Sequence, residues 1–125
     1  MGFSDIFKLR NKNTKNYGQL LFQNEFLIVG EKYECQKNHK KKRPNVIKKT
    51  NIKSPVHIEK YLYKGDPAYM VVNTKLNLDL GVLSGNAAAW LTDYYSKGET
   101  KAVLTNKFKE SFHVKISVYE DNSNQ

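Results

Sequence analysis

The side chains of this chain that are best suited to chemistry are eight cations in one short stretch. Between Gln36 and Ile58 there are eight Lys and Arg residues and no Asp or Glu. The whole chain has 21 basic and 12 acidic residues and a net charge of +9. This stretch therefore supplies most of the excess positive charge. Such a concentration is typical of surfaces that bind phosphates or other polyanions, although a solvated lysine-rich loop is the alternative. The candidate phosphate-binding residues are Lys37, Lys40, Lys41, Lys42, Arg43, Lys48, Lys49 and Lys53.

A second group of candidates combines aromatic rings with charge. Tyr61, Tyr63 and Tyr69 share a short stretch with Lys64 and Asp66. Proteins that bind single strands stack bases on aromatic rings and hold the backbone with amines. The alternative is that the tyrosines pack in half-buried strands and that Asp66 bonds its own turn. We include all five residues in the candidate nucleic-acid-binding surface.

Other kinds of chemistry find little support in the sequence. The three histidines are widely separated, and Cys35 is the single cysteine; this spacing does not indicate a metal site or a thiol nucleophile. Phosphate-loop, HExxH and nucleophile-elbow motifs are absent. We therefore expect a protein that is not an enzyme and has no cofactor or metal. A single cysteine, the lack of a signal-peptide pattern and the lack of an apolar run of about 18 residues favour a cytoplasmic protein without a membrane span.

The elements that must position these residues follow from the apolar pattern. Residues 1–19 are expected to form a short helix, capped by Ser4 and running to Leu9, and a polar linker. Residues 20–120 are expected to form one domain, and residues 121–125 a disordered tail. Within the domain, alternation of apolar and polar residues predicts strands near 20–33, 56–63, 69–72, 78–82, 102–104 and 112–119. A helix is predicted over about 84–97, with Trp90 in the core and Gly98 as its stop.

The basic insertion at residues 36–58 is punctuated by Pro44 and Pro55, which disfavour a continuous helix. We expect a long loop there, or a hairpin with a disordered tip. The order of several strands, one helix and two further strands predicts a mainly β fold. It is either a small barrel of the OB or SH3 kind or a curved antiparallel sheet, with one helix over an open side.

Four short motifs in this order resemble the HIRAN domain family over roughly residues 26–119. They are an apolar strand with glycine at 28–33 (IVGEKY), a turn and strand at 64–72 (KGDPAYMVV), a glycine–apolar pair at 80–83 (LGVL) and an alanine-rich helix at 87–91 (AAAWL). The resemblance implies a small β-barrel that binds single-stranded DNA, including 3′ ends, without catalysis. It also implies that Asp66 contacts a sugar hydroxyl. The family has an aromatic residue where this chain has Gly65, so we expect general nucleic-acid binding rather than a pocket specific for a 3′ end.

Three functional hypotheses follow. The first is a non-enzymatic nucleic-acid-binding domain, for which single-stranded DNA is favoured and RNA stays open. The second is a bacterial or phage accessory module that binds a partner protein through exposed strand edges, without nucleic acid. The third places the basic segment on an anionic membrane surface. The sequence leaves the oligomeric state open.

Overall fold

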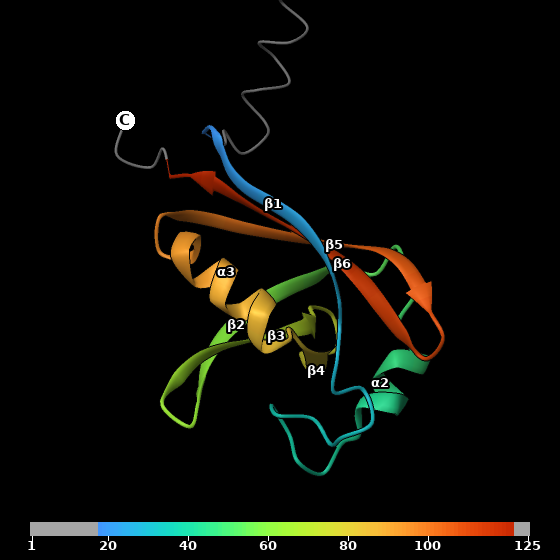
Figure 1. Ribbon diagram of the computed structural model, residues 1–125. Coiled ribbons are helices and arrows are strands. Elements are labelled where there is room, and N and C mark those ends of the chain that lie inside the picture. Colours follow the sequence, from blue (N-terminus) through green and yellow to red (C-terminus); the bar gives the residue numbers. More distant parts are fainter. Residues whose placement is uncertain (1–17, 122–125) are drawn as a thin grey trace, which may run out of the picture.

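The computed structural model describes residues 18–121, which form a six-stranded antiparallel sheet in the order β1-β6-β5-β2-β3-β4 (Figure 1). The short helix predicted before Leu9 and the tail from residue 122 lie outside the described residues. The mainly β class and the order of the predicted strands are confirmed, but the strand predicted at 102–104 extends over 98–108, and the one predicted near 20–33 ends at residue 27. The strands are β1 (Leu20–Leu27), β2 (Val56–Tyr63), β3 (Asp66–Asn73), β4 (Leu78–Val82), β5 (Gly98–Phe108) and β6 (Ser111–Glu120).

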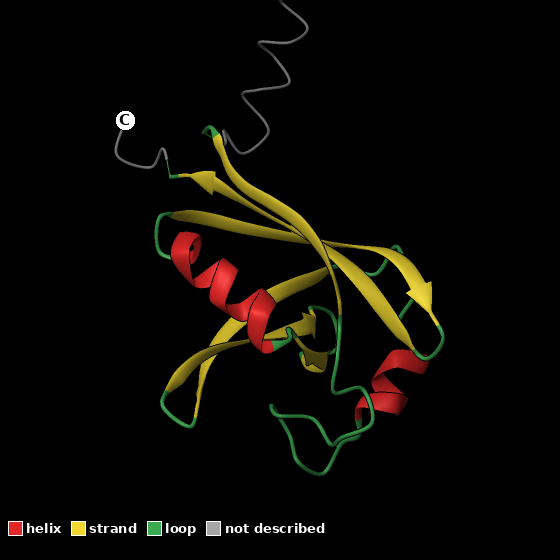
Figure 2. Ribbon diagram, in the orientation of Figure 1, coloured by secondary structure: helices red, strands yellow, loops and turns green. Residues whose placement is uncertain are grey.

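The sheet bends between two three-stranded halves (Figure 2). Strands β5 and β2 are paired at Val56 and Ala102, whereas β5–β6 and β2–β3 pair along their whole lengths. On the far side, Val29 and Val82 exchange backbone hydrogen bonds of 2.9 and 2.8 Å beyond the end of β1. Within residues 18–121 the sheet is therefore strongly curved and not closed, which confirms the curved-sheet form of the prediction over the closed barrel.

The helix α3 (Gly85–Tyr95) lies across the open side of the curved sheet, against β1, β3 and β5. It begins where predicted, because the Ser84 hydroxyl accepts a hydrogen bond from the Ala87 N–H at 3.3 Å. Its buried stripe consists of Ala87, Ala88 and Leu91. The expectation that Trp90 belongs to the core is wrong: it lies beside this stripe and is 56% exposed.

The basic insertion is more ordered than a long loop. Glu34 and Lys42 form an antiparallel bridge, and the Cys35 N–H donates to the Lys41 carbonyl at 2.8 Å. A short helix, α2 (Arg43–Lys48), follows directly and packs against β4. Pro44 lies in its first turn, where backbone N–H groups make no hydrogen bond within the helix, so the N–H that proline lacks is not needed there. The insertion thus folds as a small hairpin-like loop followed by one and a half turns of helix.

The turn between β2 and β3 fixes the position of several candidate residues. Lys64 and Gly65 both have positive φ, +52° and +86°, which is the conformation of a two-residue type I′ turn. Glycine adopts it without strain. The turn places Tyr63 and Asp66 directly opposite each other at the hairpin tip.

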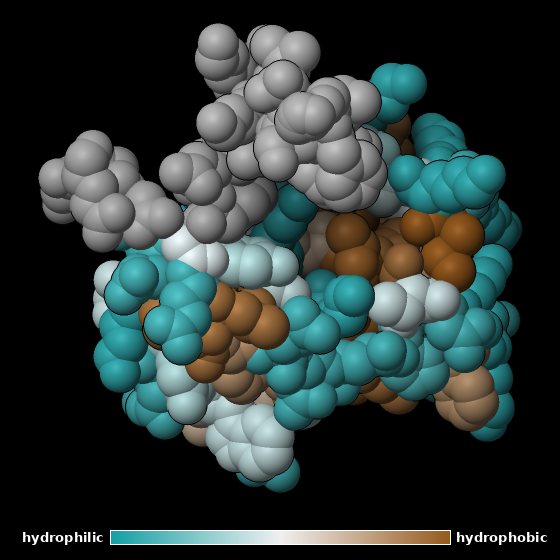
Figure 3. Space-filling view, turned by 90° about the horizontal axis from the view of Figure 1, so that it is seen from above, coloured by the Kyte–Doolittle hydropathy of each residue, from teal (hydrophilic) through white to brown (hydrophobic). Residues whose placement is uncertain are grey.

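On the face seen from above, polar side chains cover most of the surface, and apolar ones emerge in separate areas between them (Figure 3). None of the helices in residues 18–121 is long and apolar enough to cross a membrane.

Candidate functional site

A groove of about 1180 Å³ opens between three parts of the fold. One wall is the tip of the β2–β3 hairpin, the second is the first half of α3, and the third is the segment from Val29 to Arg43. We call this space the groove. It is lined by Val29, Gly30, Tyr33, Glu34, Gln36, His39, Arg43, Tyr61, Tyr63, Asp66, Pro67, Ala68, Val82, Leu83, Ser84, Gly85, Ala88, Ala89 and Thr92.

Three tyrosines from two separate parts of the sequence line the groove. Tyr61 is partly exposed, Tyr63 is 58% exposed and Tyr33 is 70% exposed. Partial burial raises the pKa of Tyr61, so its ring stays neutral across the physiological range. Sequence reasoning selected Tyr61 and Tyr63 and missed Tyr33. Its position just before the basic stretch was the available signal, but only the folding of residues 33–43 makes it line the same groove as the other two tyrosines.

Tyr69 does not belong to this surface. Its side chain is fully buried beneath α3, its hydroxyl hydrogen-bonds the Thr92 hydroxyl at 2.9 Å, and its ring packs on Tyr95 with 5.0 Å between centroids. From this residue onward β3 is covered by neighbouring elements, and Val71 and Val72 are fully buried. The prediction that Tyr69 contacts a base is therefore wrong; it is a core residue.

Arg43 is also removed from the phosphate-binding set. Its side chain is buried, with Nε donating to Asp79 Oδ2 at 2.8 Å and one terminal nitrogen donating to the Gly30 carbonyl at 2.8 Å. Asp79 has no exposed surface and also accepts the backbone N–H groups of Gln36 and Lys37, both at 2.9 Å. We call this arrangement the Arg43–Asp79 anchor. It holds the basic loop against β4. Because the Arg43 charge is paired with Asp79, it is not available to bind a phosphate.

The pKa of Asp79 reflects these contacts. Burial alone raises it, but the two backbone donors and the hydrogen bond and charge of Arg43 together hold the pKa below its usual value. The carboxylate is therefore ionised under all ordinary conditions. The ionised carboxylate accepts hydrogen bonds from three donors, the N–H groups of Gln36 and Lys37 and the Arg43 side chain. An apolar side chain at this buried position would leave these N–H groups without an acceptor, which is costly.

Lys37 has a partner as well. Its Nζ lies 2.7 Å from Glu59 Oε1, and Glu59 Oε2 lies 2.7 Å from His57 Nε2. The hydrogen bond from Lys37 is the largest influence on Glu59 and lowers the pKa of that carboxyl. This pair connects the basic loop to β2, so we assign Lys37 to holding the loop rather than to gripping a ligand.

The remaining lysines fall into two exposed groups of equal charge. Lys40, Lys41 and Lys42 lie on the loop whose neighbouring residues Glu34, Gln36 and His39 line the groove. The other group lies at the end of α2 and in the turn that follows, and none of its members lines the groove; it consists of Lys48, Lys49 and Lys53. None of the six lysines lines the groove itself, but the first group is flanked in the chain by His39 and Arg43, which do line it, whereas the second group has no such neighbours.

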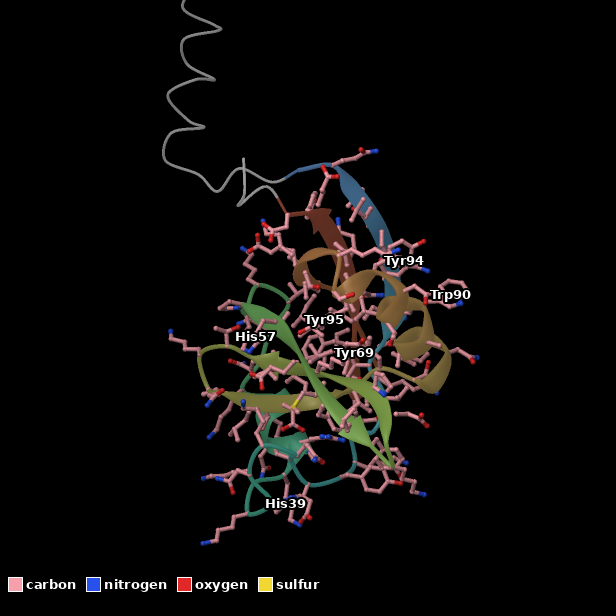
Figure 4. The ribbon with its side chains drawn as sticks, turned by 90° about the vertical axis from the view of Figure 1, so that its left-hand side faces the viewer. His39, His57, Tyr69, Trp90, Tyr94 and Tyr95 are labelled. Atoms are coloured by element: carbon pink, nitrogen blue, oxygen red, sulfur yellow. The ribbon has the colours of Figure 1, made fainter. Side chains whose placement is uncertain are left out.

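On the opposite side of the groove, Lys64 is exposed at the hairpin tip with its Nζ 5.3 Å from the centre of the Tyr63 ring. The groove itself is not strongly positive, because Glu34 and Asp66 also line it and His39 Nδ1 lies 3.1 Å from Glu34 Oε1. Figure 4 shows His39 at the outer end of the basic loop, far from His57. Rings that line the groove and exposed cations on the loop and hairpin that form two of its walls suit a ligand with planar neutral groups and an anionic backbone.

Metal and thiol chemistry have no assembled site in this part of the chain. Residues 18–121 contain no group of three or more His, Cys, Asp and Glu side chains placed to hold a metal ion. Cys35 is fully buried, its thiol is within 3.5 Å of the Asp79 carbonyl, and burial raises its pKa. A buried, protonated thiol is a poor nucleophile.

Comparison with known proteins adds no relative: no protein-family model matches the chain, and neither a curated protein nor a solved structure matches it. The function must therefore be argued from the groove and the residues around it.

Proposed function

We propose that this protein is a non-enzymatic binder of single-stranded nucleic acid, with bases in the groove and phosphates at its edge. The observation that carries the proposal is that Tyr33, Tyr61 and Tyr63 line one groove, together with His39 and Arg43, the residues on either side of the exposed Lys40–Lys42. Neither feature alone would suffice, because tyrosines are common in strands and lysines are common on surfaces.

The tyrosines supply stacking surfaces that do not depend on base identity. Stacking of a base on an aromatic side chain contributes about 1–3 kcal/mol, and every base offers a π face. Paired bases inside a duplex do not offer these faces to a groove wall. The arrangement therefore favours single strands over duplex, and it favours DNA and RNA alike.

The lysines supply the salt-dependent part of the affinity. If Lys40, Lys41, Lys42 and Lys64 each neutralise one phosphate, the log of the affinity should fall with the log of the salt concentration with a slope of about −3. The Arg43–Asp79 anchor contributes indirectly, by holding the loop that carries three of these cations next to the tyrosines.

The resemblance to the HIRAN family supports the same proposal. Its motifs at 28–33, 64–72 and 80–83 are far apart in the sequence, yet residues from each line the groove, including Gly30, Asp66 and Val82. Motifs that converge on one groove are consistent with a shared binding surface. We therefore propose a HIRAN-like domain, with Asp66 available to a sugar hydroxyl at the hairpin tip.

The test is fluorescence anisotropy with labelled single-stranded DNA, single-stranded RNA and duplex DNA at two salt concentrations. We expect single strands to bind more tightly than duplex, and Tyr63→Ala to weaken binding by about 5- to 150-fold, the equivalent of one lost stack. Phe108→Ala is the control, because Phe108 is an exposed ring at the far end of β5 that does not line the groove.

Equal losses in Tyr63→Ala and Phe108→Ala would contradict the groove as the binding surface. Absence of binding to all three oligonucleotides at low salt would overturn the proposal and would favour the partner-protein hypothesis.

A further inference from the structure

The charged side chains that line the groove offer hydrogen-bond acceptors rather than free positive charge. Two carboxylates, Glu34 and Asp66, line it on different walls. In the part of the chain that the structure describes, Arg43 is the one Lys or Arg side chain in the lining. Its donors are engaged by Asp79 and by the Gly30 carbonyl. A ligand in the groove therefore meets carboxylates, and its own anionic groups have to lie farther out, toward the lysines.

The wall formed by the hairpin carries a ring, a carboxylate and a cation side by side. Tyr63 and Asp66 are paired directly across the two strands at the hairpin tip. Lys64 lies in the turn between them, with its Nζ 5.3 Å from the centre of the Tyr63 ring. All three side chains are exposed. This wall thus offers a stacking face, an acceptor and a positive charge within one turn.

The wall formed by the basic loop repeats the same three kinds of group. Tyr33 and Glu34 are consecutive residues, and both line the groove. Lys42 is paired with Glu34 in the antiparallel bridge of the loop. These side chains are exposed as well. We call the two sets, Tyr63–Asp66–Lys64 and Tyr33–Glu34–Lys42, the ring–carboxylate–lysine triplets.

The carboxylates of both triplets have acceptor capacity left for a ligand. The Asp66 side chain makes no hydrogen bond or ion pair within residues 18–121. Glu34 Oε1 lies 3.1 Å from His39 Nδ1, and Oε2 has no partner among the same residues. A carboxylate only accepts hydrogen bonds. A ligand that covers these oxygens without donating to them leaves polar groups unpaired, which weakens its binding.

Resting on the proposed function, we propose that the strand bound in the groove is RNA rather than DNA, and that ribose 2′-hydroxyls donate to Glu34 and Asp66. In a nucleotide the sugar lies between the base and the phosphate, as the carboxylate accompanies the ring and the lysine in each triplet. The 2′-hydroxyl is the sugar donor that DNA lacks along its length. Carboxylates accept from ribose hydroxyls in the same way in dinucleotide-binding folds.

The tyrosines stack equally well on bases of either strand, so the carboxylates make the distinction. A DNA strand in the same position would cover two acceptors without offering a donor and would hold its phosphates near two negative charges. A site that hydrogen-bonds a hydroxyl discriminates against an analogue without it, because its own polar groups are then left unpaired.

The experiment measures fluorescence anisotropy with three labelled strands of one sequence, namely RNA, DNA with uracil bases, and 2′-O-methyl RNA. The methyl ether keeps the ribose and its oxygen but removes the donor. We expect RNA to bind about 10-fold more tightly than either other strand, a difference typical of hydrogen bonds to charged groups. In the double variant Glu34→Ala, Asp66→Ala the ratio of RNA to DNA affinity should fall to about 1.

The matched control is Asp93→Ala, Glu110→Ala, which removes two exposed carboxylates that do not line the groove. Its higher net charge should strengthen the binding of RNA and DNA alike and leave their ratio unchanged. Equal affinity for RNA and DNA, or for RNA and 2′-O-methyl RNA, would overturn this inference. A ratio that survives in the Glu34 and Asp66 variant would also overturn it.

The outcomes separate this inference from the function on which it rests. If RNA and DNA bind equally and Tyr63→Ala weakens both, the groove binds single strands but its carboxylates do not read the sugar. Absence of binding by every strand would overturn both proposals.

Discussion

Arg43 and the three lysines before it are neighbours in the sequence but differ in their exposure to solvent. Lys40, Lys41 and Lys42 are exposed, whereas Arg43 is buried against Asp79. The sequence shows one block of positive charge. The structure divides it into one cation that holds the loop in place and three that the loop presents to solvent.

This comparison teaches that charge density does not reveal the role of an individual cation. What distinguishes Arg43 is its partner, which lies 36 residues away on β4. Arginine suits the buried position because its planar group donates in two directions, here to Asp79 and to the Gly30 carbonyl. A lysine there would leave part of this arrangement unmade.

The largest expected effect is loss of the anchor. Asp79→Ala leaves the buried Arg43 charge with only the Gly30 carbonyl as acceptor and the N–H groups of Gln36 and Lys37 without the carboxylate, so we expect the free energy of unfolding to fall by about 3–5 kcal/mol. Chemical denaturation measures it. The control Asp66→Ala removes an exposed carboxylate and should change stability by less than about 0.5 kcal/mol. Similar stability of Asp79→Ala and the unchanged protein would contradict the anchor.

The next effect separates the two groups of exposed lysines. Replacing Lys40, Lys41 and Lys42 by alanine should weaken single-strand binding and make the salt slope less steep by about 2, because three phosphate contacts are lost. Replacing Lys48, Lys49 and Lys53 removes the same charge away from the groove and should change the slope by less. Anisotropy titrations at several salt concentrations give both slopes. Equal slopes for the two triple variants would mean that only net charge matters.

Acid should weaken the anchor. The folded pKa of Asp79 lies below its usual value of 3.8, so the unfolded chain binds more protons than the folded protein as the pH falls from near 5 through that value. Above that range Asp79 makes its full contribution to the free energy of unfolding, and this contribution is lost as the pH drops through the folded pKa. Thermal unfolding from pH 6 to pH 2 should therefore show a steeper decline in the unchanged protein than in Asp79→Asn. Parallel declines would show that the ionisation of Asp79 does not support the fold.

The smallest effect concerns Lys37. Like Arg43 it is paired with a carboxylate, but like the other lysines of the loop it keeps some exposure to solvent. Its pair with Glu59 is partly exposed, so Lys37→Ala should cost less than about 1 kcal/mol of stability. The same change should raise the pKa of Glu59 toward its ordinary value, because the hydrogen bond that lowers it is gone. A carboxyl titration followed by NMR measures this shift. An unchanged titration of Glu59 would show that the pair does not form in solution.

Local patterns in the sequence were enough to predict most of the fold. Alternation in Phe112–Val118 marked β6, and Ser84 marked the start of α3, because strand and helix periods and capping act over a few residues. The burial of Tyr69 and the exposure of Trp90 were predicted wrongly. Both depend on how α3 is rotated over the sheet, which no local pattern specifies.

The sequence by itself thus determined the mainly β class, the helix near its centre and the existence of a concentrated basic segment. Only the tertiary structure decided which cations are buried, which stay exposed and which rings share a groove. Tyr33 joins Tyr61 and Tyr63, and Arg43 leaves its lysine neighbours, because residues far apart in the chain meet at β4 and the hairpin tip. Contacts of that kind follow from the packing of whole elements, whereas strands and helices follow from interactions within them.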